Sequence, residues 1–182
     1  MPSDILVKPK IFVLGLPKSG KSDLCKTLCD KVGVVHLQVE QIIEDFMSRD
    51  SSFANRLIDT MKLKGREIDD LNLIQLICKR IERRDCRENG WVLEDFPKTR
   101  VQAKMMSQRG ITPTNVFNMD IPCSEVFSRT AAGQDSDFDC NRQVLKMRIQ
   151  YGNHHKPQVL YYYQKFYNSV TFINGMKSRW FI

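Results

Sequence analysis

The sequence predicts an α/β fold in which a doubly wound parallel β-sheet carries helices on both faces. Short, unbroken apolar runs recur along the chain, turn residues bound these runs, and segments of helical periodicity separate them. Strands that are buried on both faces of a parallel sheet read as continuous apolar runs, whereas strands with one wet face alternate between apolar and polar residues. An alternation of strands and helices along the chain is typical of such a sheet.

The N-terminal elements follow from local patterns. Residues 11–14 form an apolar run that ends at a glycine, and we expect the first strand there. A helical pattern begins after a glycine-rich stretch, with Leu24, Leu28 and Val32 recurring on one apolar face. Residues 34–37 read as a second short strand.

The rest of the chain continues this alternation. The polar, turn-rich segment that begins at Ala131 predicts a loop. A long helix with Val144, Met147 and Tyr151 follows, and we expect it to continue beyond Pro157. The other expected elements are helices near residues 42–47, 53–62 and 71–81, a strand at 91–93, a helix at 99–108, and strands at 116–119 and 170–173.

The composition predicts a single domain, residues 1–182, that needs no disulfides. Hydrophobic residues make up 42% and charged residues 27% of the chain, which is ordinary for a globular protein of this length. The six cysteines form no Cys-x-x-Cys pair and indicate reduced thiols. No apolar run has the length of a membrane span, and the N-terminus lacks a signal-peptide pattern. We expect a cytoplasmic or nuclear protein without a membrane partner, monomeric as a domain or part of a longer chain.

The charge of the chain fits an anionic partner. The formal net charge is +7, but the basic residues are scattered. The densest group lies in a stretch of helical periodicity, where a solvated helix face is the simpler explanation. Because no nucleic-acid-binding motif accompanies this charge, we expect no nucleic-acid partner. The basic group consists of Lys79, Arg80, Arg83 and Arg84.

A phosphate-binding motif lies between the first strand and the first helix. Residues 15–22 read Gly-Leu-Pro-Lys-Ser-Gly-Lys-Ser and match the P-loop pattern. The glycines let successive backbone N–H groups point at phosphate oxygens, and the helix N-terminus adds its positive dipole. We expect Lys21 to reach the terminal phosphates of ATP and Ser22 to bind Mg²⁺. The predicted ATP-binding residues of this loop are Pro17, Lys18, Ser19, Gly20, Lys21 and Ser22.

A second motif resembles the adenylate kinase family. Residues 90–98 read Gly-Trp-Val-Leu-Glu-Asp-Phe-Pro-Lys, where that family reads Gly-Phe-Leu-Ile-Asp-Gly-Phe-Pro-Arg, and Gln-Ala follows in both. The Gly-Leu-Pro opening of the P-loop, His36, and the run Gly-Arg-Glu-Ile at 65–68 are also similar, so the resemblance covers nearly the whole chain. It implies a P-loop NTPase fold and transfer of the γ-phosphate of ATP, bound with Mg²⁺, to AMP or a related nucleoside monophosphate (NMP).

The resemblance also implies a division of the chain into three parts. The core would comprise residues 1–36, 87–130 and 139–182. A helical NMP-binding insertion would comprise about residues 37–86. A short lid would comprise about residues 131–138, which is too short for a large zinc-bearing lid.

Individual site residues follow from the same resemblance. Glu94 falls on an acidic residue that supports magnesium, so it joins Ser22 in the expected metal site. Arg129 falls near an arginine that contacts ATP, and Arg148 falls on one directed at the transferring phosphates; either could instead be a surface cation. With Lys21, these two arginines form the expected catalytic set. The expected NMP-binding residues are Ile68, Lys98, Gln102 and Arg148, with Gln102 on a glutamine that reads adenine.

The chain departs from the family at its acceptor site. Glu44 replaces an arginine and would repel a monophosphate, while Lys98 replaces another arginine and loses its bidentate fork. Asp95 replaces a glycine, and Asp137 lies near the position of a lid arginine. Two functions therefore stay open: an NMP kinase with a divergent acceptor site, or a catalytically weak or inactive ATP/ADP-binding module of a larger multi-domain protein.

Overall fold

The structure is a computed structural model that describes residues 7–49, 68–132 and 142–177. The expected helix at 53–62, nearly all of the expected lid at 131–138, and Asp137 lie outside the described residues. Within the described ranges, no helix combines the length and the apolar character that a membrane span requires.

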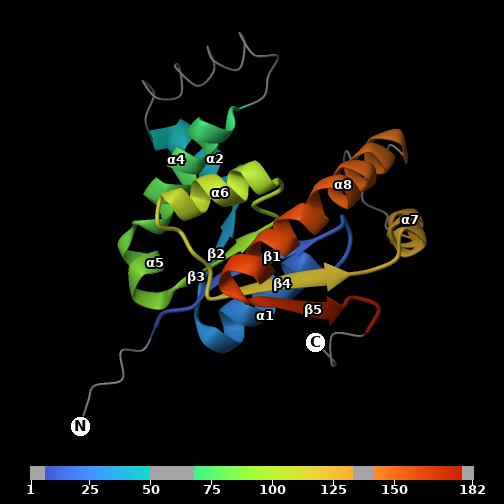
Figure 1. Ribbon diagram of the computed structural model, residues 1–182, viewed down its shortest axis with the longest axis horizontal. Helices are drawn as coiled ribbons and strands as arrows, with labels where there is room; N and C mark the ends of the chain where they lie inside the picture. The colour runs from blue at the N-terminus through green and yellow to red at the C-terminus, as the bar shows by residue number, and fades with distance from the viewer. Residues whose placement is uncertain (1–6, 50–67, 133–141, 178–182) are drawn as a thin grey trace.

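The five described strands form one parallel sheet in the order β2-β3-β1-β4-β5 (Figure 1). This order places β1 at the centre of the sheet. Strands β3 and β2 lie on one side of it, and β4 and β5 lie on the other. The predicted α/β fold class is thereby confirmed. The strands are β1 (Lys10–Gly15), β2 (Val35–Gln38), β3 (Trp91–Glu94), β4 (Asn115–Asp120) and β5 (Val170–Asn174).

Helices cover both faces of this sheet. Figure 1 shows α1 on one face and α6 and α8 on the other, with α2 and α4 above α6 in this view. Two short helices, α5 and α7, were not predicted, whereas α8 continues through Pro157 as expected. The helices are α1 (Lys21–Val32), α2 (Val39–Arg49), α4 (Asp70–Ile81), α5 (Arg84–Asn89), α6 (Arg100–Gln108), α7 (Cys123–Ala132) and α8 (Arg142–Tyr167).

The central strand β1 contributes side chains to a core on each face of the sheet. Its successive side chains point to opposite faces, so Phe12 joins the core under α6 and α8 while Val13 joins the core under α1. Both side chains are fully buried. The Phe12 ring lies 5.5 Å, centroid to centroid, from both Trp91 and Tyr163. Truncating such a buried aromatic side chain typically costs about 3–5 kcal/mol.

Helix α1 packs on the sheet as far as Cys29 but not at its C-terminal end. Leu24 is buried and Leu28 is half-buried, but Val32 is 51% exposed. The apolar face predicted for this helix is therefore correct near the glycine-rich loop and wrong at its C-terminal end. Gly33, with φ 78°, ends the helix and donates its N–H to the Cys29 carbonyl.

Candidate active site

A cavity of about 1140 Å³ opens at the carboxyl ends of β1 and β3. Ligands of open parallel sheets bind at these ends, and the volume is large enough for a nucleotide. The cavity is lined by the whole glycine-rich loop, by the segment that follows β3, and by one face of α8. Its polar lining includes Lys18, Ser19, Lys21, Ser22, Gln38, Glu94, Asp95, Lys98, Arg129, Arg148 and Lys156.

The loop between β1 and α1 has the backbone that a phosphate-binding loop requires. Lys18 and Gly20 have positive φ angles of 58° and 92°. A Cβ at Gly15 would lie 2.9 Å from both the carbonyl oxygen and the Cβ of Met119, so this position needs a glycine. Ser19 is buried, and its Oγ has no hydrogen-bond partner among the described residues. A polar atom buried in this way fits a loop that completes its bonding with a ligand.

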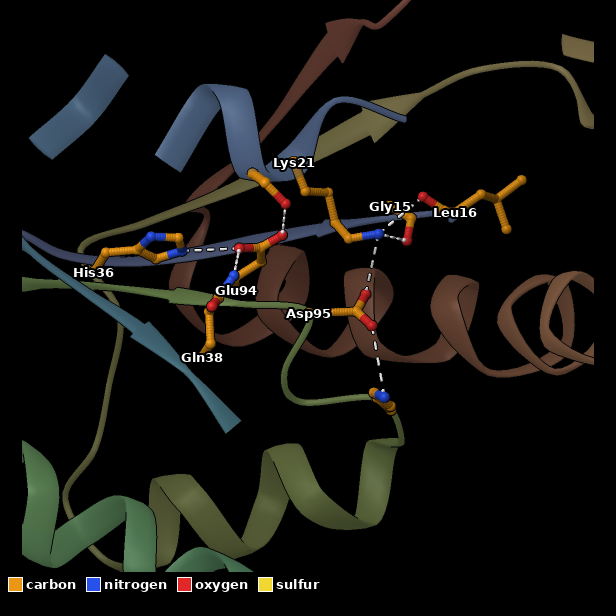
Figure 2. Close-up of polar contacts among 9 residues, drawn as sticks. Gly15, Leu16, Lys21, His36, Gln38, Glu94 and Asp95 are labelled. Atoms are coloured by element: carbon orange, nitrogen blue, oxygen red, sulfur yellow. Dashed lines mark hydrogen bonds and ion pairs between the residues drawn. The ribbon is translucent and has the colours of Figure 1, made fainter. Parts of the chain in front are cut away.

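Lys21 lies folded against its own loop. Its Nζ donates hydrogen bonds to the carbonyl oxygens of Gly15 and Leu16, at 2.9 and 2.8 Å, and lies 3.3 Å from Oδ1 of Asp95 (Figure 2). The side chain is 10% exposed. The ammonium group thus lies in the wall of the cavity, between two carbonyl oxygens and a carboxylate.

Glu94, at the end of β3, is held by three side chains. Ser22 Oγ donates to Oε1 at 2.5 Å, while His36 Nε2 and Gln38 Nε2 contact Oε2 at 2.8 and 3.0 Å (Figure 2). Burial alone would raise the pKa of Glu94, but these hydrogen bonds from His36, Ser22 and Gln38 outweigh it and lower the pKa to about 2. His36 therefore acts on the site by fixing an ionised Glu94.

The residues at this point fit a magnesium ion. The Ser22 hydroxyl and the Glu94 carboxylate are hard oxygen ligands, lie in contact, and both line the cavity. Cys25 Sγ also lies within 4.8 Å of the ligand atoms of His36 and Glu94. Burial raises the pKa of the Cys25 thiol and keeps it protonated, so the oxygen pair is the better metal site.

Arg129 supports the glycine-rich loop from the side of α7. Its Nη1 donates to the Lys18 carbonyl oxygen at 3.1 Å, and its Nη2 donates to the Gly175 carbonyl oxygen at 2.8 Å. Its Nε donates to Glu125 Oε1 at 2.7 Å. The guanidinium thus ties the loop to the turn after β5, and it also lines the cavity.

One face of α8 presents two cations to the cavity. Arg148, Gly152 and Lys156 follow one another at intervals of four residues and all line the cavity. Gly152 permits a close approach of the loop, because a Cβ there would lie 3.1 Å from Leu16 Cδ2. Burial lowers the pKa of Lys156. Lys156 was not predicted, although its helical spacing from Arg148 is a signal that could have found it.

The expected NMP-binding residues are only partly brought together. Lys98 lines the cavity, and its Nζ lies 3.5 Å from Asp95 Oδ2. Gln102 is buried outside the lining, where Oε1 accepts from the backbone N–H of Lys98 and Thr99 and Nε2 donates to Asp70 Oδ1. Ile68 is half-buried and likewise absent from the lining. The NMP-binding role of Gln102 and Ile68 stays a prediction.

Glu44 also lies apart from the cavity. It is exposed on α2, and it does not belong to the described lining. Asp95, in contrast, lines the cavity and contacts both Lys21 and Lys98. Of these two acidic departures from the family pattern, Asp95 is therefore the one that faces the lysines of the cavity.

Comparison with known proteins identifies the family. A sequence model of the family described as adenylate kinase matches residues 13–167, which include the glycine-rich loop and α8. The chain belongs to the adenylate kinase family. Adenylate kinase 8 of Xenopus laevis is 37% identical over 114 residues, 63% of this chain and 23% of that protein. Adenylate kinase 8 of Homo sapiens is 33% identical over 121 residues, 66% of this chain and 24% of that protein.

A third relative matches along almost the whole chain. Adenylate kinase 9 of Mus musculus is 24% identical over 180 residues, which are 95% of this chain and 10% of that protein. The chain thus spans about a quarter or less of the length of these adenylate kinase relatives.

Proposed function

We propose that this adenylate kinase-family chain is an NMP kinase that transfers the γ-phosphate of ATP to AMP or a related NMP. One observation carries the proposal: the P-loop lysine Lys21, the oxygen pair Ser22–Glu94, and the cations Arg148 and Lys156 line one cavity. A phosphoryl-transfer site needs this combination of a phosphate grip, hard metal ligands and neutralising cations.

Each of the three parts of the chain has one proposed role. The core, residues 1–36, 87–130 and 139–182, holds ATP on the P-loop. The insertion, about residues 37–86, closes on the NMP, with Ile68, Lys98 and Gln102 as proposed contacts. The lid, about residues 131–138, covers the triphosphate. The partners are ATP or ADP and an NMP.

In the proposed reaction, the acceptor phosphate attacks the γ-phosphorus of ATP in line. The acceptor oxygen is already a good nucleophile, so positioning and charge neutralisation dominate. Lys21 exchanges its bonds to the Gly15 and Leu16 carbonyls for bonds to the terminal phosphates of ATP. Arg148 and Lys156 stabilise the charge on the transferred group from the side of α8. Ser22 and Glu94 would hold a magnesium ion, which would supply Lewis-acid stabilisation of that charge.

One observation on the acceptor side of the cavity favours a second function, that of a weak or inactive ATP/ADP-binding module. There Lys98, which replaces a bidentate arginine of the family pattern, is paired with Asp95. The chain matches only a small part of the length of each relative, which also fits one module of a larger protein.

A coupled assay of ATP consumption against a panel of NMPs separates the two functions. The kinase proposal predicts turnover with at least one NMP, which Lys21→Ala removes while Lys26→Ala, an exposed lysine on the same helix, retains it. Binding of ATP by calorimetry without turnover of any NMP would favour the module.

A further inference from the structure

Asp95 occupies a backbone position that favours glycine. Its φ of 57° lies in the left-handed region, which side chains other than those of Asn and Asp rarely adopt. The family pattern described above has a glycine at this position. A charged residue held at a conformational cost beside a site indicates that its side chain contributes there.

The carboxylate of Asp95 bridges two lysines of the site. Its Oδ1 lies 3.3 Å from Lys21 Nζ, and its Oδ2 lies 3.5 Å from Lys98 Nζ (Figure 2). The side chain is 47% exposed and lines the cavity. Asp95 thus already supplies the P-loop lysine with the anionic partner that a terminal phosphate would provide.

We propose that Asp95 is a specificity-determining residue that disfavours the γ-phosphate and so shifts the preference of the P-loop from ATP towards ADP. The inference rests on the proposed nucleotide site. For Lys21 to bind the γ-phosphate, that phosphate must displace the carboxylate or lie beside it, and either arrangement costs electrostatic free energy. ADP lacks this phosphate and avoids most of the cost. A divalent cation on the phosphates offsets part of the repulsion, so the discrimination is larger without magnesium.

Two variants separate the charge of Asp95 from its backbone conformation. Asp95→Asn keeps a side chain that tolerates the left-handed region and removes only the charge, whereas Asp95→Gly also relieves the conformation. Because Asp95 is half exposed, solvent screens its charge. We expect both variants to tighten ATP on the order of 10-fold and ADP by no more than about 3-fold.

Calorimetric titration with ATP and with ADP, each with magnesium and with a chelator, tests the inference. The matched control is Glu40→Gln, which removes one negative charge from the wall of the same cavity without touching the Lys21–Asp95 pair. A higher ATP-to-ADP affinity ratio in both Asp95 variants, and an unchanged ratio in Glu40→Gln, supports the inference. Equal ratios in the wild type and the Asp95 variants, or the same increase in Glu40→Gln, overturns it.

The two proposals fail in different measurements. A chain that binds ATP and turns over no NMP contradicts the kinase proposal, while the affinity ratios still decide the role of Asp95. Thermal unfolding checks that each variant is folded, and Asp95→Gly serves where Asp95→Asn loses stability.

Discussion

Ser22, at the start of α1, donates a hydrogen bond to Glu94, which lies 72 residues later at the end of β3. This contact joins the phosphate loop to a neighbouring strand, because β1 and β3 are adjacent and parallel. Glu94 is in turn fixed by His36 and Gln38 from β2. Strands β2 and β3 and the start of α1 therefore fix the Ser22–Glu94 oxygen pair at one corner of the cavity.

Lys21→Ala should weaken ATP binding by at least about 100-fold, because it removes a charge-assisted donor from the terminal phosphates. Lys26→Ala should change the affinity by less than about 2-fold, since this lysine is exposed on α1 outside the cavity lining. Titration calorimetry measures both. Equal affinity in wild type and Lys21→Ala would mean that the nucleotide binds elsewhere.

The Glu94 network should make stability depend on pH in the acid range. The folded-state pKa, about 2, lies below the ordinary value of 4.5, so the stabilisation is complete above pH 4.5 and is lost as the pH falls towards 2. Its size is roughly 3 kcal/mol. Urea unfolding should show Glu94→Gln less stable than wild type at pH 7, with a difference that narrows below pH 4. A difference that stays constant over this range would contradict the assignment.

Lys98→Arg should lower the Michaelis constant for the acceptor NMP about 3- to 10-fold, because arginine binds a phosphate bidentately. The turnover number should change little, since uniform binding does not accelerate the chemical step. Glu44→Arg, a larger change of charge, should leave both constants nearly unchanged because Glu44 lies outside the described lining. Steady-state kinetics at varied NMP concentration measures both constants. A larger effect of Glu44→Arg than of Lys98→Arg would show that the insertion brings Glu44 close to the bound NMP.

Lys156→Gln should lower kcat/KM by about 10- to 100-fold, because it removes a partly buried cation from the cavity. Lys146→Gln provides the matched control on the same helix, since Lys146 is exposed and outside the described lining. The initial rates of the two variants should differ clearly. Similar losses of kcat/KM in both variants would mean that Lys156 acts only through the net charge of the protein.

Sequence patterns predicted the parts of this fold that local chemistry determines. The apolar runs mark β1 and β3 because each is buried on both faces. The glycine-rich loop needs Gly15 for its close approach to Met119. Helices α5 and α7 escaped prediction. The first is six residues long and strongly charged, so it has almost no apolar period to detect.

Predictions that depend on long-range packing were less accurate. Val32 has the helical period of a core residue, but α1 leaves the sheet before reaching it. The resemblance gave Gln102 a role toward adenine, which stays a prediction; in this structure its side chain caps α6 and donates to Asp70. The pairing of Asp95 with Lys21 depends on the adjacency of β1 and β3, which no local pattern contains.

The most direct test of the proposed kinase is ³¹P NMR of ATP and the best NMP acceptor from the panel, with magnesium present. Each phosphoryl transfer yields ADP from ATP and a second diphosphate from the NMP, so two diphosphate β-phosphate signals should grow for each γ-phosphate signal of ATP that is lost. Lys21→Ala should remove this exchange and Lys26→Ala should retain it. Release of one inorganic phosphate with only one diphosphate for each ATP consumed, or transfer at an unchanged rate in Lys21→Ala, would contradict the proposal.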